Sequence, residues 1–324
     1  MLKMKGYVTK RSRRNSGPFF IKKNSKMRIT IVGLGLIGGS MAKDLRKSGF
    51  ATELIGVDTN EAHAAKALEL GLVDRISSLE EGVSQTDLVL IAIPVDKTLA
   101  VLPEILDRIE SGTTVADMGS TKKALVDSVA SHKRRKNYVA AHPMSGTENS
   151  GPAAALEDLF RGKIAIVCDQ ENSGPQHIAL IEKMFQNLGM DIAYMTSDEQ
   201  DHSTAFVSHL PHAAAFALAN AVQAKEDRSI IFDLASGGFR STVRLAKSAG
   251  SMWHPIFQQN RRYVVEALNV YIKHLKEFRD CMKEEDDERM WELIENANRI
   301  RNILAGETPH LVKNEETITK LYTR

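Results

Sequence analysis

The sequence contains little cysteine, few aromatic residues and no long apolar run. Its two cysteines, Cys168 and Cys281, lie far apart and form no C-x-x-C pair. This excludes a disulfide framework or a zinc cluster and favours a reducing cytoplasm. Aromatic residues make up 6% of the chain, too few for a protein that stacks nucleic-acid bases. With no secretory signal and no run long enough to cross a bilayer, we expect neither nucleic acid nor a membrane as a partner.

The rest of the composition is that of an ordinary globular protein with a basic start. Hydrophobic residues make up 43% and charged residues 26% of the 324 residues, enough to bury a large core in two domains. Residues 1–26 hold nine Lys and Arg and no Asp or Glu. This segment would suit a nucleic-acid arm or a transit peptide, but it lacks apolar periodicity, so we expect a disordered extension. We expect the polar residues 306–324 to be a frayed tail.

A glycine-rich motif follows the first apolar run. Residues 27–32 are largely β-branched and apolar, and three glycines with G-x-G-x-x-G spacing then precede good helix formers. Gly33 would form a tight turn, Gly35 would let the backbone approach a pyrophosphate, and Gly38 would let the helix lie close to the strand. The pattern predicts a dinucleotide site at a helix N-terminus, contacted by Gly33, Leu34, Gly35, Leu36, Ile37, Gly38, Ile93 and Pro94.

An acidic residue ends the second predicted strand. Asp58 lies 20 residues after Gly38, where a carboxylate would accept hydrogen bonds from the adenosine ribose hydroxyls. Because it would also repel a 2′-phosphate, we expect NAD rather than NADP as the cofactor. The alternative is that Asp58 only caps the next helix, in the sequence Asp-Thr-Asn-Glu.

Strands and helices alternate up to residue 196. Apolar runs predict further strands at 53–58, 73–76, 87–94, 113–117, 138–142, 163–168 and 191–195. Helical patterns lie between several of them, at 61–72, 95–107 and 175–188. This alternation predicts an α/β fold, a Rossmann-type doubly wound parallel sheet over residues 27–196.

From residue 197 the pattern is helical only. Segments at roughly 199–224, 229–235, 240–248, 254–283 and 286–304 predict an all-α domain over residues 197–305. The run Thr204–Val222 is apolar and rich in Ala, but His209, Pro211 and His212 interrupt it, so we interpret it as a buried helix. A subunit interface would bury such a helix, and we therefore expect a homodimer formed by this helical domain.

Two candidate catalytic residues follow strands of the predicted sheet. Ligands of such sheets bind at the carboxyl ends of the strands, where Ser120 and His142 are placed. Oxidation of an alcohol needs a base for the hydroxyl proton, and histidine titrates in a suitable range. Ser120 would hydrogen-bond the imidazole and fix its tautomer. The alternatives are a structural histidine packed under a loop and a serine that caps a helix.

The helical domain adds histidines and arginines. His202, His209 and His212 are spaced by seven and three residues and share one helix face. They would line a polar pocket or be satisfied in the core, and we expect no metal because carboxylate companions are missing. Arg240 and Arg244 lie one turn apart and would bind a carboxylate through the guanidinium fork, unless they belong to a solvated helix face.

Five motifs occur in the order Gly-Leu-Gly-Leu-Ile-Gly-Gly-Ser (33–40), Asp-Met-Gly-Ser-Thr-Lys (117–122), His-Pro-Met-Ser-Gly-Thr-Glu (142–148), Ser-His-Leu-Pro-His (208–212) and Gly-Gly-Phe-Arg-Ser-Thr-Val-Arg-Leu-Ala (237–246). Together they resemble the prephenate dehydrogenase family, over about residues 27–300. The resemblance implies NAD-dependent oxidative decarboxylation of prephenate to 4-hydroxyphenylpyruvate in tyrosine biosynthesis. It also implies a homodimer with the active site between the two domains.

The resemblance implies roles for single residues as well. His142 matches the histidine that hydrogen-bonds the ring hydroxyl and takes its proton, and Ser120 matches the serine that positions that group. Arg244 matches the arginine that holds a substrate carboxylate. The expected lining of the substrate pocket is Thr121, Ser208, His209 and His212.

Three other functions are compatible with the sequence. Arogenate is an alternative substrate, since it carries an amino group where prephenate has a keto group. Another NAD-dependent hydroxyacid dehydrogenase on the same two-domain plan is the second, although such enzymes usually rely on a catalytic lysine. The third is an NAD-binding regulatory protein whose residues 1–26 bind nucleic acid. That function would leave Ser120, His142 and Arg244 without a shared purpose.

Overall fold

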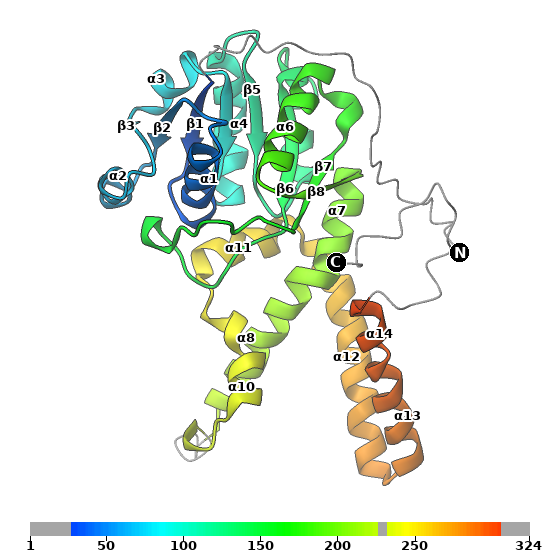
Figure 1. Cartoon of the computed structure of the whole chain (residues 1–324). Coiled ribbons are helices and arrows are strands. Elements are labelled where there is room, and N and C mark those ends of the chain that lie inside the picture. Colours follow the sequence, from blue (N-terminus) through cyan, green and yellow to red (C-terminus); the bar gives the residue numbers. More distant parts are fainter. Residues whose placement is uncertain (1–26, 226–231, 306–324) are drawn as a thin grey trace. The chain divides into compact units, whose positions relative to one another are not determined.

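The computed structural model describes residues 27–225 and 232–305 (Figure 1). The predictions for residues 1–26 and 306–324, and part of the helix predicted at 229–235, lie outside these ranges. The described residues belong to two compact units, one ending at Arg261 and the other beginning at Arg262. Each unit is described here by itself.

The first unit contains an eight-stranded sheet in the order β3-β2-β1-β4-β5-β6-β7-β8. Its strands are β1 (Arg28–Val32), β2 (Glu53–Val57), β3 (Arg75–Ile76), β4 (Leu88–Ile91), β5 (Thr114–Asp117), β6 (Tyr138–Pro143), β7 (Ile164–Cys168) and β8 (Asp191–Met195). Strands β1 to β6 are parallel, which confirms the predicted Rossmann-type doubly wound sheet. The strand order reverses between β1 and β4, the place where such sheets bind dinucleotides.

The prediction of a wholly parallel sheet is wrong at β7. This strand pairs antiparallel with β6, so that Ala140 lies opposite Cys168 and Pro143 lies opposite Ala165. A parallel partner would need a crossover connection, usually an α-helix. The connection from β6 to β7 contains only a short 3₁₀-helix, Pro152–Ala154, and the chain therefore turns back at the carboxyl end of β6.

Helices cover both faces of the sheet (Figure 1). One face carries α1 (Leu36–Lys47), α2 (Glu61–Glu69) and α6 (Pro175–Asn187), and the other carries α3 (Leu79–Ser84), α4 (Val95–Arg108) and α5 (Lys123–Ser128). Strand side chains alternate between the two cores because successive residues point to opposite faces. In β4, Leu88 and Leu90 enter the first core, whereas Val89 and Ile91 enter the second.

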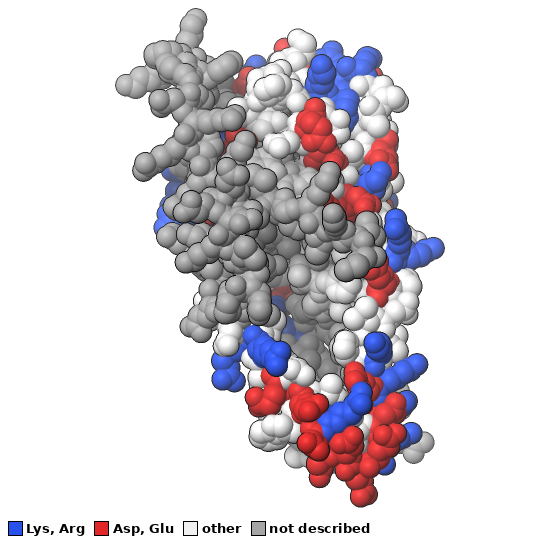
Figure 2. Space-filling view, turned by 90° about the vertical axis from the view of Figure 1, so that its right-hand side faces the viewer, with Lys and Arg blue, Asp and Glu red and all other residues white. Residues whose placement is uncertain are grey.

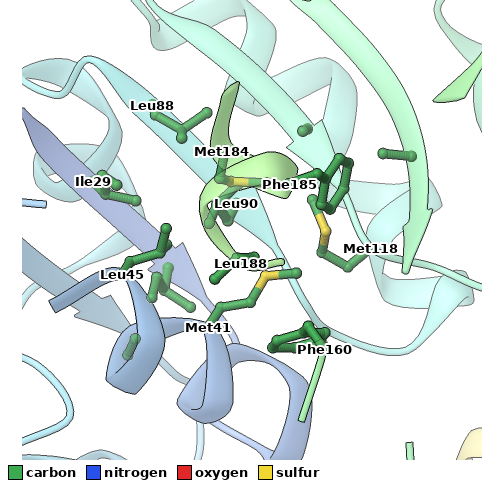
Figure 3. Packing of buried hydrophobic residues seen from close by; sticks show 14 of the residues in the cluster. Ile29, Met41, Leu45, Leu88, Leu90, Met118, Phe160, Met184, Phe185 and Leu188 are labelled. Atoms are coloured by element: carbon green, nitrogen blue, oxygen red, sulfur yellow. The ribbon is translucent and has the colours of Figure 1, made fainter. Parts of the chain in front are cut away.

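Figure 3 shows the core beneath α1 and α6. Met41 and Leu45 of α1 and Met184 and Phe185 of α6 pack with Leu90 of the sheet, and all five side chains are fully buried. Burying each apolar side chain of this size contributes about 1.5–3 kcal/mol. The core therefore holds α1, and with it the glycine motif, firmly on the sheet.

Only helices follow β8 in the described ranges, as predicted. The first unit ends with α7 (Ser197–Thr204), the π-helix Ala205–His209, α8 (Leu210–Gln223), α10 (Gly237–Thr242), the 3₁₀-helix Arg244–Lys247 and α11 (Gly250–Gln259). The helix predicted at 199–224 is thus interrupted. The Leu210 N–H bonds to the carbonyl of Ala205, five residues back, and Pro211 has no N–H to continue a regular pattern.

The expectation that no run is long enough to cross a bilayer is wrong by length and composition, because the helical run Ser197–Gln223 passes that test. Its 18-residue apolar window is only 17% buried within the chain. The core helix of a soluble protein passes the same test of length and composition. Within the chain, much of this apolar surface is therefore not buried.

The second unit consists of helices too. They are α12 (Arg261–Glu284), α13 (Asp287–Asn298) and α14 (Ile300–Leu304), so the helix predicted at 254–283 is divided at Asn260. Acidic side chains gather at the turn between α12 and α13, where residues 284–288 are all Asp or Glu (Figure 2). Large apolar side chains are exposed on α12 and α13, among them Val265, Ile272, Leu275, Met282, Trp291 and Ile294.

Candidate active site

The glycine motif forms the turn between β1 and α1. Gly33 has a φ of +97°, which favours glycine, and a Cβ there would lie 2.5 Å from the carbonyl oxygen of Ala92. A Cβ on Gly38 would lie 2.0 Å from the Gly33 carbonyl oxygen, whereas a Cβ on Gly35 would meet nothing within 4 Å. No side chain caps α1 and its first turn holds no acid, so its amide groups are available to an anion beside Gly35.

Asp58 connects the end of β2 to this turn. Its Oδ2 accepts a hydrogen bond from the Leu34 N–H at 2.9 Å, and its Oδ1 accepts from the Asn60 N–H at 2.9 Å. Helix α2 is capped by Asn60, whose side chain accepts from the His63 N–H. The alternative that Asp58 caps this helix is therefore wrong, and the carboxylate belongs to the glycine turn.

His142 lies near the end of β6 and is 8% exposed. Burial, followed by the charges of Lys122 and His209, lowers the pKa of His142 well below 6.5. The ring is therefore neutral at pH 7, the state in which a histidine accepts hydrogen bonds and protons. Its Nδ1 lies 3.0 Å from the amide nitrogen of Gln200 on α7.

Ser120 does not make the hydrogen bond to His142 that the sequence predicts. Its Oγ is buried and has no partner among the described residues. Its carbonyl oxygen accepts from the Gln200 amide nitrogen at 3.0 Å, so Gln200 takes the position expected for the serine. Ser120 does not cap α5 either. The amides of Lys122 and Lys123 donate instead to the carboxylate of Asp201, at 2.7 and 3.0 Å.

A buried ion pair lies beside His142. The Lys122 ammonium contacts the carboxylate of Asp117 and donates to the carbonyl of Ala141 at 2.7 Å. The Tyr138 hydroxyl donates to the second oxygen of Asp117 at 2.6 Å. A fully buried ion pair needs such additional hydrogen bonds to offset its desolvation. These contacts join β5 to β6 at Ala141, the residue before His142.

The π-helix carries His209 into the interior. His209 is fully buried, and its Nδ1 lies 3.0 Å from the amide nitrogen of Asn260, which also donates to the Asp201 carbonyl at 2.6 Å. Burial, followed by the charge of His212, lowers the pKa of His209 to about 4. Its Nε2 has no partner in the described part of the chain. No three His, Cys, Asp or Glu side chains converge as metal ligands within that part.

The other predicted pocket residues are distributed around this centre. His212 stacks on Trp253, with ring centroids 3.5 Å apart, and its Nδ1 donates to the Ser208 carbonyl at 2.9 Å. The Thr121 hydroxyl donates to Oε1 of Gln259 on α11 at 2.6 Å. Arg244 is half exposed, and its guanidinium pairs with Glu148 at 2.9 Å. The guanidinium is thus held at the loop that follows His142.

The sequence does not predict several residues of this centre, chiefly Gln200, Trp253, Gln259 and Asn260. Helix α7 buries Ser197, Gln200, Asp201 and Thr204, which have the 3–4 spacing of a buried helix face. All four are polar, so hydrophobic periodicity gives no signal for them. Their 3–4 spacing just before an apolar helix is the only feature of the sequence that could have predicted a buried polar helix face.

Three features define the class of protein. They are an uncapped glycine turn where the strand order reverses, a carboxylate beside that turn, and a buried neutral histidine at the same edge of the sheet. Such a site belongs to an NAD-dependent dehydrogenase. Comparison with known proteins places the chain further. The sequence profile of the prephenate dehydrogenase nucleotide-binding domain matches residues 41–194, and that of the prephenate dehydrogenase dimerization domain matches residues 196–296.

Individual relatives agree with these matches. Prephenate dehydrogenase of Bacillus subtilis is 32% identical over 278 residues, 85% of this chain and 75% of that protein. Cyclohexadienyl dehydrogenase of Zymomonas mobilis is 29% identical over 288 residues, 88% of this chain and 98% of that protein. The crystal structure of Aquifex aeolicus prephenate dehydrogenase with hydroxyphenyl propionate and NAD⁺ has a TM-score of 0.79 and 31% identity, covering 86% of this chain and 99% of that one. The chain therefore belongs to the prephenate dehydrogenase family.

Proposed function

We propose that the protein oxidises and decarboxylates prephenate to 4-hydroxyphenylpyruvate with NAD⁺, a step of tyrosine biosynthesis. The observation that carries this proposal is the buried neutral His142 at the carboxyl end of β6, which Gln200 joins to Ser120, whose hydroxyl has no partner among the described residues. The chain belongs to the prephenate dehydrogenase family, which supports this activity. Its two widely separated cysteines favour a cytoplasmic location.

The residues of the glycine turn fit NAD. The turn Gly33–Gly38 would hold the pyrophosphate, because the space above Gly35 is open and the first amides of α1 are uncapped. Asp58 would accept hydrogen bonds from the adenosine ribose, and Ile93 and Pro94 would flank the cofactor from the end of β4. When bound, NAD⁺ supplies the acceptor for the hydride that leaves the hydroxyl-bearing ring carbon.

His142 takes the proton of the ring hydroxyl in the proposed reaction. A neutral base is available because burial keeps the imidazole uncharged. Ser120 would orient the hydroxyl through its free Oγ. Loss of carbon dioxide follows because it makes the ring aromatic, so the chain needs only to position the substrate carboxylates and not to polarise them strongly.

Arg244 holds a substrate carboxylate in this proposal. In the free chain its guanidinium is paired with Glu148, and a carboxylate of the substrate would replace that partner bidentately. The helical residues Ser208, His209 and His212 and the sheet-edge residue Thr121 complete the pocket. His209 Nε2 is a buried nitrogen without a described partner, which a bound molecule would satisfy.

The decisive test is NADH formation at 340 nm with purified protein, NAD⁺, and either prephenate or arogenate. Turnover with prephenate supports the proposal, and the ratio of the two rates fixes the preference. Arogenate must be included because Synechocystis arogenate dehydrogenase also resembles the chain, with a TM-score of 0.69 and 28% identity over 85% of this chain and 99% of that one. A folded protein that binds NAD⁺ but oxidises neither compound would refute the proposal.

A homodimer formed through the helical domain is the proposed assembly. Two observations support it. The run Ser197–Gln223 is apolar but only 17% buried in its 18-residue window, and α12 exposes an apolar stripe that includes Leu275, 50% exposed. Sedimentation of Leu275→Asp is expected to show a loss of dimer, because a charge in an apolar interface is costly. Lys273→Glu, on the opposite face of α12, is the control and should remain dimeric. A dimeric Leu275→Asp would exclude α12 from the interface.

A further inference from the structure

His209 is a fully buried histidine whose two ring nitrogens have different surroundings. Its Nδ1 lies 3.0 Å from the amide nitrogen of Asn260, just after α11, whereas its Nε2 has no partner among the described residues. Burial, followed by the charge of His212, lowers the pKa of His209 to about 4. The ring is therefore neutral at pH 7 and carries one proton, whose position decides whether Nε2 donates or accepts a hydrogen bond.

Asn260 determines which ring nitrogen of His209 carries that proton. The same amide nitrogen of Asn260 lies 2.6 Å from the backbone carbonyl oxygen of Asp201, which can only accept a hydrogen bond. The NH₂ group must therefore face Asp201, because a turned amide would set its oxygen against the carbonyl oxygen. The second N–H of Asn260 then points at His209 Nδ1, which is the acceptor. The ring proton of His209 is thus on Nε2, and this nitrogen is a donor.

His212, three residues later in the same motif, is held in the opposite form. Its Nδ1 lies 2.9 Å from the carbonyl oxygen of Ser208, so that Nδ1 carries the proton. Burial lowers the pKa of His212 below 6.5, so this ring is neutral at pH 7.5 and has a lone pair on Nε2. The two histidines of the Ser-His-Leu-Pro-His motif therefore have opposite polarity at Nε2.

A second buried donor lies next to His209. The Trp253 Nε1–H has no partner in the described ranges, and its ring meets that of His209 edge to face, with centroids 5.8 Å apart. Both N–H groups are uncharged and can only donate. A buried donor without a partner is costly, and an acceptor atom of a bound molecule removes that cost.

We propose that His209 donates its Nε2–H to an acceptor oxygen of the substrate, and that Asn260 is the positioning residue that keeps His209 a donor. Because the proposed function places the substrate in this pocket, the inference rests on that function. Two kinds of oxygen in prephenate fit, a carboxylate oxygen and the keto oxygen of the side chain. An ammonium group does not fit, because it is itself a donor.

The two tautomers are measurable by ¹⁵N NMR on the full-length protein labelled at histidine. The signals are assigned by their loss in His209→Gln and His212→Gln. At pH 7.5 we expect Nε2–H at His209 and Nδ1–H at His212. Asn260→Asp should put a proton on Nδ1 of His209, because aspartate has no N–H to donate to that nitrogen, and should leave His212 unchanged as the internal control.

The wild-type spectrum tests the assignment even if Asn260→Asp does not fold. A wild-type His209 with its proton on Nδ1 would overturn the proposal. So would an Asn260→Asp variant in which Nδ1 of His209 stays unprotonated, because Asn260 would then not be the residue that sets the tautomer.

Substitution of His209 tests the hydrogen bond to the substrate. Glutamine keeps an N–H near the position of Nε2, whereas methionine has a similar length and no donor. His209→Met should raise the KM for prephenate about tenfold or more with a smaller change in kcat, and His209→Gln should raise it no more than about threefold. A packing role alone would raise KM equally in both variants, and equal values would refute the donor role.

Arogenate distinguishes the two kinds of oxygen. It shares the carboxylates of prephenate but has an ammonium group in place of the keto oxygen. If His209 binds a carboxylate, His209→Met should weaken both compounds by the same factor, measured as KM or as Ki against prephenate. If it binds the keto oxygen, the loss should be confined to prephenate. Unchanged constants for both would refute the contact. The tautomer of the free enzyme does not depend on the substrate, so this inference and the proposed function fail separately.

Discussion

Replacing Gly38 or Gly35 of the glycine motif by alanine should impair two different properties, fold stability in the first case and cofactor binding in the second. A Cβ on Gly38 would lie 2.0 Å from the Gly33 carbonyl oxygen and 2.9 Å from Ile31, so α1 must move away from β1. Overpacking of this kind costs about 3 kcal/mol or more, because one contact is with backbone that cannot rotate away. A Cβ on Gly35 would meet nothing within 4 Å, and the φ of −77° there suits alanine. Its effect on the free energy of unfolding should stay within about 1 kcal/mol.

The same Gly35→Ala variant should lose the cofactor. The open space beside Gly35 lies at the uncapped N-terminus of α1, where a methyl group would keep the pyrophosphate from the amides. A tenfold or greater rise in the Kd for NAD⁺ corresponds to about 1.4 kcal/mol or more. Saturating NAD⁺ at about 100 times the wild-type Kd should stabilise the wild type by about 2.7 kcal/mol and Gly35→Ala by much less.

Thermal unfolding with and without NAD⁺, together with calorimetric titration, measures both effects. Gly38→Ala is expected to have a strongly lowered Tm even without cofactor, whereas Gly35→Ala should have a nearly wild-type Tm that NAD⁺ no longer raises. Wild-type affinity for NAD⁺ in Gly35→Ala would refute the placement of the pyrophosphate. A wild-type Tm in Gly38→Ala would refute the close packing of helix on strand.

Three further predictions concern the histidines and Arg244. His142→Asn should keep NAD⁺ binding and lose kcat by about 100-fold or more, since it removes the base but keeps a polar group. Arg244→Gln should raise the KM for prephenate about tenfold or more with a smaller change in kcat, because the carboxylate loses its charged partner. The wild type should lose stability relative to His209→Gln as the pH falls from 6.5 towards 4, by at most about 3 kcal/mol in urea unfolding. Stability falls because, in this pH range, His209 binds a proton in the unfolded chain but stays neutral in the folded chain, where its pKa is about 4.

Each of these predictions has a contrary result. Near-full activity of His142→Asn would exclude His142 as the base, and an unchanged KM in Arg244→Gln would exclude the carboxylate contact. The His209→Gln variant also serves as the control for other groups that titrate in the same pH range. Asp201, whose pKa burial raises to about 6, adds stability as the pH falls towards 3.8, and it does so in both proteins. A pH-independent difference between wild type and His209→Gln would show that His209 is not protonated preferentially in the unfolded chain.

The active-site contacts could be predicted only where one local pattern encodes them. The glycine spacing requires a turn with positive φ and close helix packing, and both are present at Gly33 and Gly38. The contact between Ser120 and His142 was expected from their neighbouring strand ends, yet Gln200 lies between the serine carbonyl and the ring. Gln200 is 58 residues from His142, and no periodicity links an amide to partners at that distance.

The sequence by itself determined the alternating strands and helices, the glycine turn, Asp58 at the end of β2 and the change to helices after residue 196. Each depends on residues close together in the chain, through backbone sterics and the burial of alternate side chains. Only the tertiary structure decided the reversal of β7, the π-helix that buries His209, and the carboxamides that contact the two buried histidines. Those features follow from where distant segments meet, because a polar group that leaves water must find its hydrogen-bond partner in whichever element packs against it.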